Sequence, residues 1–243
     1  MKPPRHCDPT DLWLLQAARE ELDELFALGN LLQTLYRQVE RMRAGVILAD
    51  TALHNSDQLS DALRQEFEQV KRGGSTSPDL KNRQAVFTHW TNIAAHSVID
   101  TVFQFQEALA NLNAWADTAR VAEALVNRSA AVEADRLFNK HFPKWKQIRH
   151  ATAHATEISL NHERNSHKGA LSHMLLRKKK GVAAMISESF VNRTFTTTRR
   201  GELLTFDITA ESYSKLNSIY ELLLSGFIVA PERSPKNQTF APL

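Results

Sequence analysis

The residues best suited to chemistry are Arg149, His150 and His154, which belong to the run R-H-A-T-A-H. Metal-free cleavage of RNA needs one group that takes the 2′-OH proton and another that protonates the leaving 5′-oxygen. Histidine, whose unperturbed pKa is about 6.5, can do either at neutral pH. A guanidinium is always charged, and its fork suits the extra negative charge on a phosphate in the transition state. These three residues therefore carry the groups that such cleavage requires.

The spacing of Arg149 and His154 indicates how they could work together. Residues five positions apart on a helix point roughly 140° apart around its axis, so the two cannot form a tight pair on one ridge. They can flank a groove that a partner helix fills, so a dimer would make sense of this spacing. His150 lies four residues before His154 and shares its face of the helix.

A metal site is the alternative use of the same histidines. His150, His154 and Glu157 form the pattern H-x-x-x-H-x-x-E, and a four-residue spacing lets two histidines bind one zinc ion. The pattern lacks the glutamate of H-E-x-x-H, and a fourth ligand would have to come from loop histidines that we expect to be solvated: His162, His167 and His173. We therefore expect no metal. The chain also has no glycine-rich phosphate loop of the Walker or Rossmann type, so we expect no cofactor.

The charge of the chain is concentrated around this segment. The whole chain has 30 Lys and Arg, 27 Asp and Glu and a net charge of +3. Residues 136–180 hold 11 of the bases and two of the acids, a net charge of +9, whereas the rest of the chain carries −6. Such asymmetry indicates an anionic partner, nucleic acid foremost, although a run of four bases is also common on a solvated loop. The predicted RNA contacts are Lys144, Trp145, Lys146, Arg177, Lys178, Lys179 and Lys180.

Composition places the chain among soluble globular proteins. Of its 243 residues, 42% are hydrophobic and 23% charged, which is enough chain to bury a core. The single cysteine, Cys7, cannot form an intramolecular disulfide, which excludes a disulfide-stapled secreted scaffold. No run approaches the roughly 20 apolar residues of a membrane span, and the first residues lack the apolar core of a signal peptide. We expect a cytoplasmic protein with no membrane partner.

Apolar residues recur at helical spacing over most of the chain and predict a mainly all-α fold, with residues 1–243 as a single domain. Gly29-Asn30 predicts a break in the first helical stretch. The predicted helices cover residues 10–54, 56–72, 79–117, 119–139 and 143–158. We expect the apolar stripe of the first stretch and three tryptophans to lie in the core: Leu12, Leu15, Leu22, Leu25, Phe26, Trp90, Trp115 and Trp145. Trp145 has base stacking as its other use, and packing is the one we favour.

The C-terminal third changes its pattern. β-Branched and aromatic residues at a period of two predict a small β-hairpin over residues 183–208, with a turn at 200–202. Thr209 predicts the start of a closing helix that ends near Gly226. Residues 231–243 contain three prolines and predict a flexible tail. No internal repeat and no heptad array stand out.

The run from Arg149 to His154 resembles the signature of the HEPN superfamily. In that signature an arginine, a polar residue next to it and a histidine five positions after the arginine lie on a late helix of a bundle. The match covers Arg149, His150 and His154, with small residues between them. Long helices before the motif, and a hairpin and a closing helix after it, also fit, and the abortive-infection branch is the most similar.

This resemblance implies a HEPN-like bundle that acts as a metal-independent ribonuclease, with a composite active site in a homodimer. It also implies a prokaryotic defence or toxin role, with an antitoxin or regulatory protein as a further partner. His154 would be the acid/base residue, Arg149 would stabilise the transition state, and His150 would orient the phosphate or the catalytic histidine. The alternative is a non-catalytic helical module that binds RNA or a protein through the basic segment.

Overall fold

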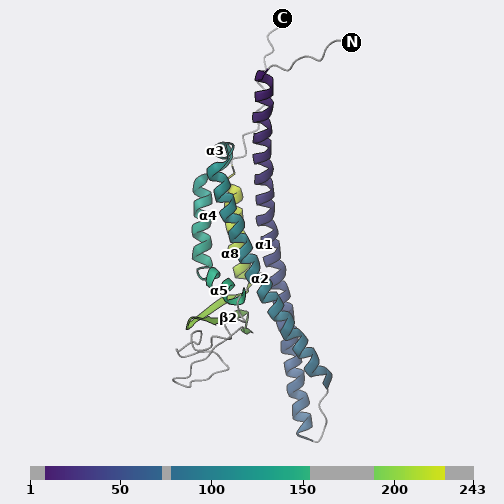
Figure 1. Cartoon of the computed structure of the whole chain (residues 1–243). Helices are drawn as coiled ribbons and strands as arrows, with labels where there is room; N and C mark the ends of the chain where they lie inside the picture. Colours follow the sequence, from purple (N-terminus) through teal and green to yellow (C-terminus); the bar gives the residue numbers. More distant parts are fainter. Residues whose placement is uncertain (1–8, 73–77, 154–188, 228–243) are drawn as a thin grey trace, which may run out of the picture.

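The computed structural model describes residues 9–72, 78–153 and 189–227, and its mainly helical fold confirms the predicted fold class (Figure 1). The helices are α1 (Pro9–Val70), α2 (Pro78–Thr118), α3 (Ala122–Leu125), α4 (Arg128–His141), α5 (Trp145–Ala153) and α8 (Ala210–Ser225). The strands are β1 (Ser189–Val191), β2 (Thr194–Arg199) and β3 (Glu202–Asp207). Parts of three predicted elements lie outside the described residues, namely 154–158, 183–188 and 231–243.

α1 is one continuous helix of 62 residues, so the predicted break at Gly29-Asn30 and the predicted boundary near Asn55 are wrong. A glycine in a helix interior costs only about 1 kcal/mol relative to alanine. The buried line of Leu28, Leu35 and Val39 continues across the glycine. Packing along this line stabilises the helix more than one weak residue destabilises it, because most helical stability in proteins comes from tertiary contacts.

α1 and α2 form an antiparallel pair around the core. Arg41 of α1 donates a hydrogen bond to Gln104 of α2 at 3.0 Å, and Gln84 of α2 donates to Ser60 of α1 at 2.8 Å. Along this pair the two helices bury a set of apolar side chains: Leu35, Val39, Met42, Val98, Val102 and Phe105. At Gly45 the helices approach so closely that a Cβ would lie 2.5 Å from Cγ2 of Val98.

α4, α5 and α8 cover one side of this pair (Figure 1). Phe138 of α4 stacks on Phe105 of α2, with ring centres 6.0 Å apart. Phe138 also meets Trp145 edge to face at 5.8 Å. Such ring pairs add a geometric preference to the burial of their area, so this cluster fixes α4 and the start of α5 against α2.

The predicted single helix over residues 119–139 is wrong, because the chain is divided between α3 and α4. Val126 leaves the helical conformation and forms a β-bridge with Phe227. Asn127 then caps α4, since its side chain accepts a hydrogen bond from the Ser129 N–H at 3.0 Å. Asparagine is a favoured N-cap residue, and this signal in the sequence marks the boundary.

The three strands form an antiparallel sheet in the order β1-β2-β3. β2 and β3 confirm the predicted hairpin, and Arg200 and Gly201 of its turn both have positive φ, as the tight turns of hairpins require. Phe190 and Thr194, which the prediction placed in one strand, belong to β1 and β2. The chain turns between them at Asn192-Arg193, which also has positive φ at both positions.

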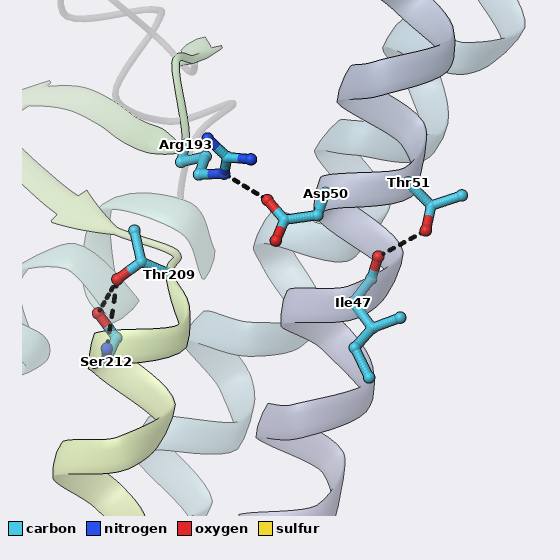
Figure 2. A network of polar contacts seen from close by, with 6 residues as sticks. All are labelled: Ile47, Asp50, Thr51, Arg193, Thr209 and Ser212. Atoms are coloured by element: carbon cyan, nitrogen blue, oxygen red, sulfur yellow. Dashed lines mark hydrogen bonds and ion pairs between the residues drawn. The ribbon is translucent and has the colours of Figure 1, made fainter.

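Two contacts fix the sheet and the closing helix (Figure 2). Arg193, in the β1–β2 turn, forms an ion pair with Asp50 of α1. Thr209 caps α8 by accepting a hydrogen bond from the Ser212 N–H at 3.3 Å, which confirms the predicted start of this helix. Gly226 caps its other end, also as predicted.

Part of the predicted core is exposed. Leu15, Leu22, Leu25 and Phe26, in the N-terminal part of α1, are exposed. Trp90 is 49% exposed, whereas Trp115 and Trp145 pack against the core as predicted. Helical spacing identifies an apolar face, but it does not tell whether another element reaches far enough to cover that face.

Two alanine substitutions in α1 test this description. Gly29→Ala is expected to stabilise the protein by up to about 1 kcal/mol, because alanine favours a helix and its Cβ would meet open space. Gly45→Ala is expected to destabilise it, because the Cβ would lie 2.5 Å from Val98 Cγ2 and force the helices apart. Urea unfolding followed by circular dichroism at one protein concentration measures both. Equal shifts in the two variants would contradict the close approach at Gly45.

Candidate functional site

α5 presents the motif on a short amphipathic helix. Trp145, Ile148 and Ala151 recur every three residues and are buried, and α5 contacts α2, β2 and β3. Arg149 and His150 follow this line by one and two positions, so they turn out of the core. Arg149 is half-buried and His150 is exposed. The packing of α5 thus sets Arg149 at the edge of the buried face.

Arg149 points to α2, where an acid and an aromatic ring receive it. Its Nε lies 2.9 Å from Oδ1 of Asp100, and its guanidinium carbon lies 5.2 Å from the centre of the Phe103 ring. The Arg149 side chain is 32% exposed and that of Asp100 51%. The guanidinium is therefore held between a carboxylate and a ring while part of it still faces solvent.

The contact between Arg149 and Asp100 is an ion pair and not a regular hydrogen bond. The two atoms are close, but Nε is buried and has no partner of hydrogen-bond geometry among the described residues. An ion pair this exposed contributes at most about 1 kcal/mol to stability. A guanidinium has five N–H donors, and the contact with Asp100 engages only the Nε side. The main effect of the contact with Asp100 is therefore to orient the Arg149 guanidinium.

The structure describes only some of the predicted site residues. His150 lies on the exposed side of α5, beside Arg149 in the chain. His154 comes directly after the last described residue of α5 and lies outside the described ranges, so its position relative to Arg149 stays a prediction. The predicted RNA contacts Arg177, Lys178, Lys179 and Lys180 lie outside them as well.

The basic residues at the start of α5 have different surroundings. Lys144 forms an ion pair with Glu202 of β3. The exposed Lys146 places its Nζ 5.2 Å from the centre of the Trp145 ring. Trp145 itself is 8% exposed and packs on Phe103 with ring centres 5.6 Å apart, which is the packing role we favoured over base stacking. Lys144 and Lys146 are thus the predicted RNA contacts that reach the surface here.

Asp100, Phe103 and Glu202 are parts of this site that the sequence analysis missed. They lie on α2 and β3, far from the motif in the sequence, and no local spacing pattern connects them with it. Asp100 lies at an exposed position of α2, so the pattern of its neighbours gives no signal that a base approaches it.

A groove of about 480 Å³ adjoins Asp100 between α1 and α2. Asp100 therefore belongs both to the contact with Arg149 and to the wall of this groove. The exposed Arg41 adds a second guanidinium to the same surface. The lining residues are Arg41, Ala44, Gly45, Leu48, Ser97, Asp100, Thr101 and Gln104.

No family model, no curated protein and no solved structure matches this chain. The resemblance to the HEPN superfamily accordingly rests on Arg149, His150 and His154 and on the order of the elements around them.

Two further findings concern metal ions and membranes. Within the described ranges, no group of three or more His, Cys, Asp and Glu side chains comes together in a way that could hold a metal ion. His154 and Glu157 of the metal alternative lie outside those ranges. None of the described helices is both long and apolar enough to cross a bilayer.

A second cavity, of about 360 Å³, lies between the start of α5, β3 and α8. His141 is one of the titratable residues in its wall, and Lys215 is another. Burial lowers the pKa of His141, and the positive charges of Lys215 and Lys140 lower it further, against a smaller opposing effect of Glu211. The neutral imidazole is therefore the form that the folded protein favours.

This lowered pKa predicts a loss of stability on mild acidification. The unfolded chain binds a proton at His141 more readily, so the stabilising effect is present above about pH 6.5 and is lost as the pH falls toward the folded-state pKa. We expect the urea midpoint of the wild type to fall between about pH 7 and 5.5 by more than that of His141→Gln. Glu211 and Glu133 also have lowered pKa values, and both titrate below this window. Equal falls in the two proteins would contradict the prediction.

Proposed function

We propose that the protein is a metal-independent endoribonuclease of the HEPN type, with Arg149, His150 and His154 in its active site. One observation supports this most strongly: Arg149, the arginine of the motif, is oriented by Asp100 and Phe103 and remains partly exposed. A guanidinium that is already oriented can bind a phosphate with little further loss of freedom. Preorganised donors of this kind are the main source of transition-state stabilisation in many enzymes.

The roles in this proposal follow from the chemistry of the side chains. A neutral His154 takes the proton of the 2′-OH as its oxygen attacks phosphorus, and a protonated His154 of a second copy gives a proton to the leaving 5′-oxygen. The products are a 2′,3′-cyclic phosphate and a free 5′-OH. Arg149 stabilises the charge that develops on the phosphate, and His150 orients it. A composite site in a dimer supplies both the base and the acid.

Asp100 is a positioning residue in this proposal. Without RNA, its carboxylate holds the Arg149 guanidinium in place. An incoming phosphate carries the same sign of charge as Asp100 and competes with it for the guanidinium. Asp100 therefore lowers the affinity for RNA while it keeps Arg149 ready for the transition state.

The RNA backbone would be held by Lys144, Lys146 and the basic run from Arg177 to Lys180. Lys144 is paired with Glu202, but both side chains are nearly half exposed, and a pair this exposed is weak enough for a phosphate to replace. The cytoplasmic location, the defence or toxin role and the antitoxin or regulatory partner come from the sequence and the family resemblance alone.

The direct test is cleavage of RNA by the purified protein in EDTA. We expect cleavage that survives the chelator and leaves 2′,3′-cyclic phosphate ends. His154→Ala should reduce the rate by about 10²–10⁴-fold, and Arg149→Ala by about 10²–10³-fold, because a transition-state donor is lost. His89→Ala, which removes an exposed histidine of α2 away from the motif, is the matched control and should cleave normally.

Two results would reject the proposed function. One is the absence of turnover on structured, single-stranded and transfer RNA. The other is cleavage that persists in both His154→Ala and Arg149→Ala, which would point to a contaminating nuclease. RNA binding that weakens steeply with salt and does not change in His154→Ala would favour the non-catalytic binding module.

Asp100→Asn tests the positioning role separately. Removal of one negative charge beside the phosphate site should tighten RNA binding by about fivefold, from a surface interaction of about 1 kcal/mol. The cleavage rate at saturating RNA should fall, because Arg149 is less well oriented. Asp50→Asn, which removes a partly exposed partner of another arginine, Arg193, is the control and should change neither value. If the affinity for RNA and the cleavage rate of Asp100→Asn both rose or both fell, the positioning role of Asp100 would be contradicted.

A further inference from the structure

A stripe of exposed apolar side chains runs along α1, away from the core. We call it the α1 stripe, and Leu22 and Phe26, which are 60% and 76% exposed, lie at its centre. At 3.6 residues per turn, its members fall within an arc of roughly 120° around the helix axis. The arc is centred roughly 110° away from the buried line of Leu28, Leu35 and Met42. The members of the α1 stripe are Leu14, Leu15, Leu22, Leu25, Phe26, Tyr36 and Ile47.

The first five members lie where α1 is accessible to another chain. The N-terminal end of α1 projects past the rest of the bundle (Figure 1). Residues on its inner side still touch the body, since Glu20 pairs with Arg120 and Glu24 accepts a hydrogen bond from the Val121 N–H. The α1 stripe faces away from these contacts. An apolar face of this size on a surface helix normally marks an interaction site.

The area of the α1 stripe fits a protein interface. From ordinary side-chain sizes, the five members between Leu14 and Phe26 offer roughly 600 Å² per chain. Two such surfaces bury at most roughly 1,200 Å², which is the lower limit of a stable specific interface. The α1 stripe of one chain can therefore be buried against the α1 stripe of another chain.

The shape of the α1 stripe also suits contact with itself. Ala18 and Gly29 lie within the arc, both are exposed, and a Cβ at Gly29 would meet open space. Large residues of one copy can pack over these small positions of the other, as a two-fold interface requires of a single surface. Arg19 and Glu21 flank the stripe on either side and provide the polar rim of such an interface.

The charge of this segment excludes RNA as the occupant. Residues 9–28 contain five acids and one base, a net charge of −4, in contrast to the basic region around the motif. A polyanion or an anionic lipid surface would be repelled here. Glu20, Asp23 and Glu24 lie outside the arc of the stripe, so the apolar face of a second copy can approach it with these charges turned away.

We infer that the α1 stripe is the surface through which two copies of this chain dimerise. The choice of a second copy rests on the proposed function, which also calls for a dimer, whereas the surface itself is argued from α1 alone. Dimerisation can be measured without RNA, so the two proposals can fail independently.

The test is the oligomeric state of the full chain by sedimentation equilibrium over about 1 to 100 µM. We expect the wild type to dimerise in this range. Leu22→Glu and Phe26→Glu should weaken the dimer at least 100-fold, because each would bury a charge in the interface. Glutamate is a good helix former at these exposed positions, so the variants should fold. Val132→Glu, at a residue of α4 that is 69% exposed, is the control and should dimerise like the wild type.

Three results would overturn the inference. They are a wild type that stays monomeric at 100 µM, a dimer that Leu22→Glu and Phe26→Glu leave unchanged, and a chain that dimerises only after residues 228–243 are removed. The last result would mean that this segment covers the α1 stripe within one chain. A stripe-dependent dimer that does not cleave RNA keeps the inference and rejects the proposed function. RNA cleavage by a dimer that Leu22→Glu and Phe26→Glu leave unchanged rejects the inference and keeps the proposed function.

Discussion

The close approach of α1 and α2 at Gly45 is the constraint on which the rest of the structure depends. With no Cβ at Gly45, Val98 can sit against α1, and the two helices bury their apolar lines along a long antiparallel contact. This contact fixes the orientation of α2 and hence the directions of Asp100 and Phe103. α5 then packs on the surface that α2 offers. The candidate site is thus assembled on α2, although its motif lies on α5.

The contacts of Arg149 orient its side chain but add little to the stability of the protein. Its pairing with Asp100 is too exposed to stabilise the fold by much, and its contact with the Phe103 ring is of similar size. Together they select one orientation of a long, flexible side chain. The aromatic cluster beneath, where Phe138 joins α2, α4 and α5, is part of the buried core that stabilises the protein. Stability and preorganisation are therefore supplied by different residues of the same helices.

Features governed by near neighbours were predictable from the sequence, and features governed by distant segments were not. The cap at Thr209 and the turn at Arg200-Gly201 depend on a few adjacent residues, and both were predicted. The continuity of α1 through Gly29 depends on packing against α2 and α8. These helices are distant in the sequence, so the residues around Gly29 do not indicate that packing. For the same reason helical spacing could not separate the exposed Leu22 from the buried Leu35. The motif marked Arg149 but could not reveal Asp100, since only the fold brings them together.

The length of α1 separates the α1 stripe from the candidate site along the helix axis. Gly45 is level with Asp100. The centre of the stripe between Leu14 and Phe26 lies about 25 residues, or roughly 37 Å of helix, from that level. If two chains paired through this part of α1 with their helices antiparallel, their Arg149 residues would lie about 70 Å apart. Both could not then contact one phosphodiester. Only a side-by-side pairing, with both helices running in the same direction, keeps the two arginines at one height. The direction in which two long helices run would then decide whether two half-sites can ever meet.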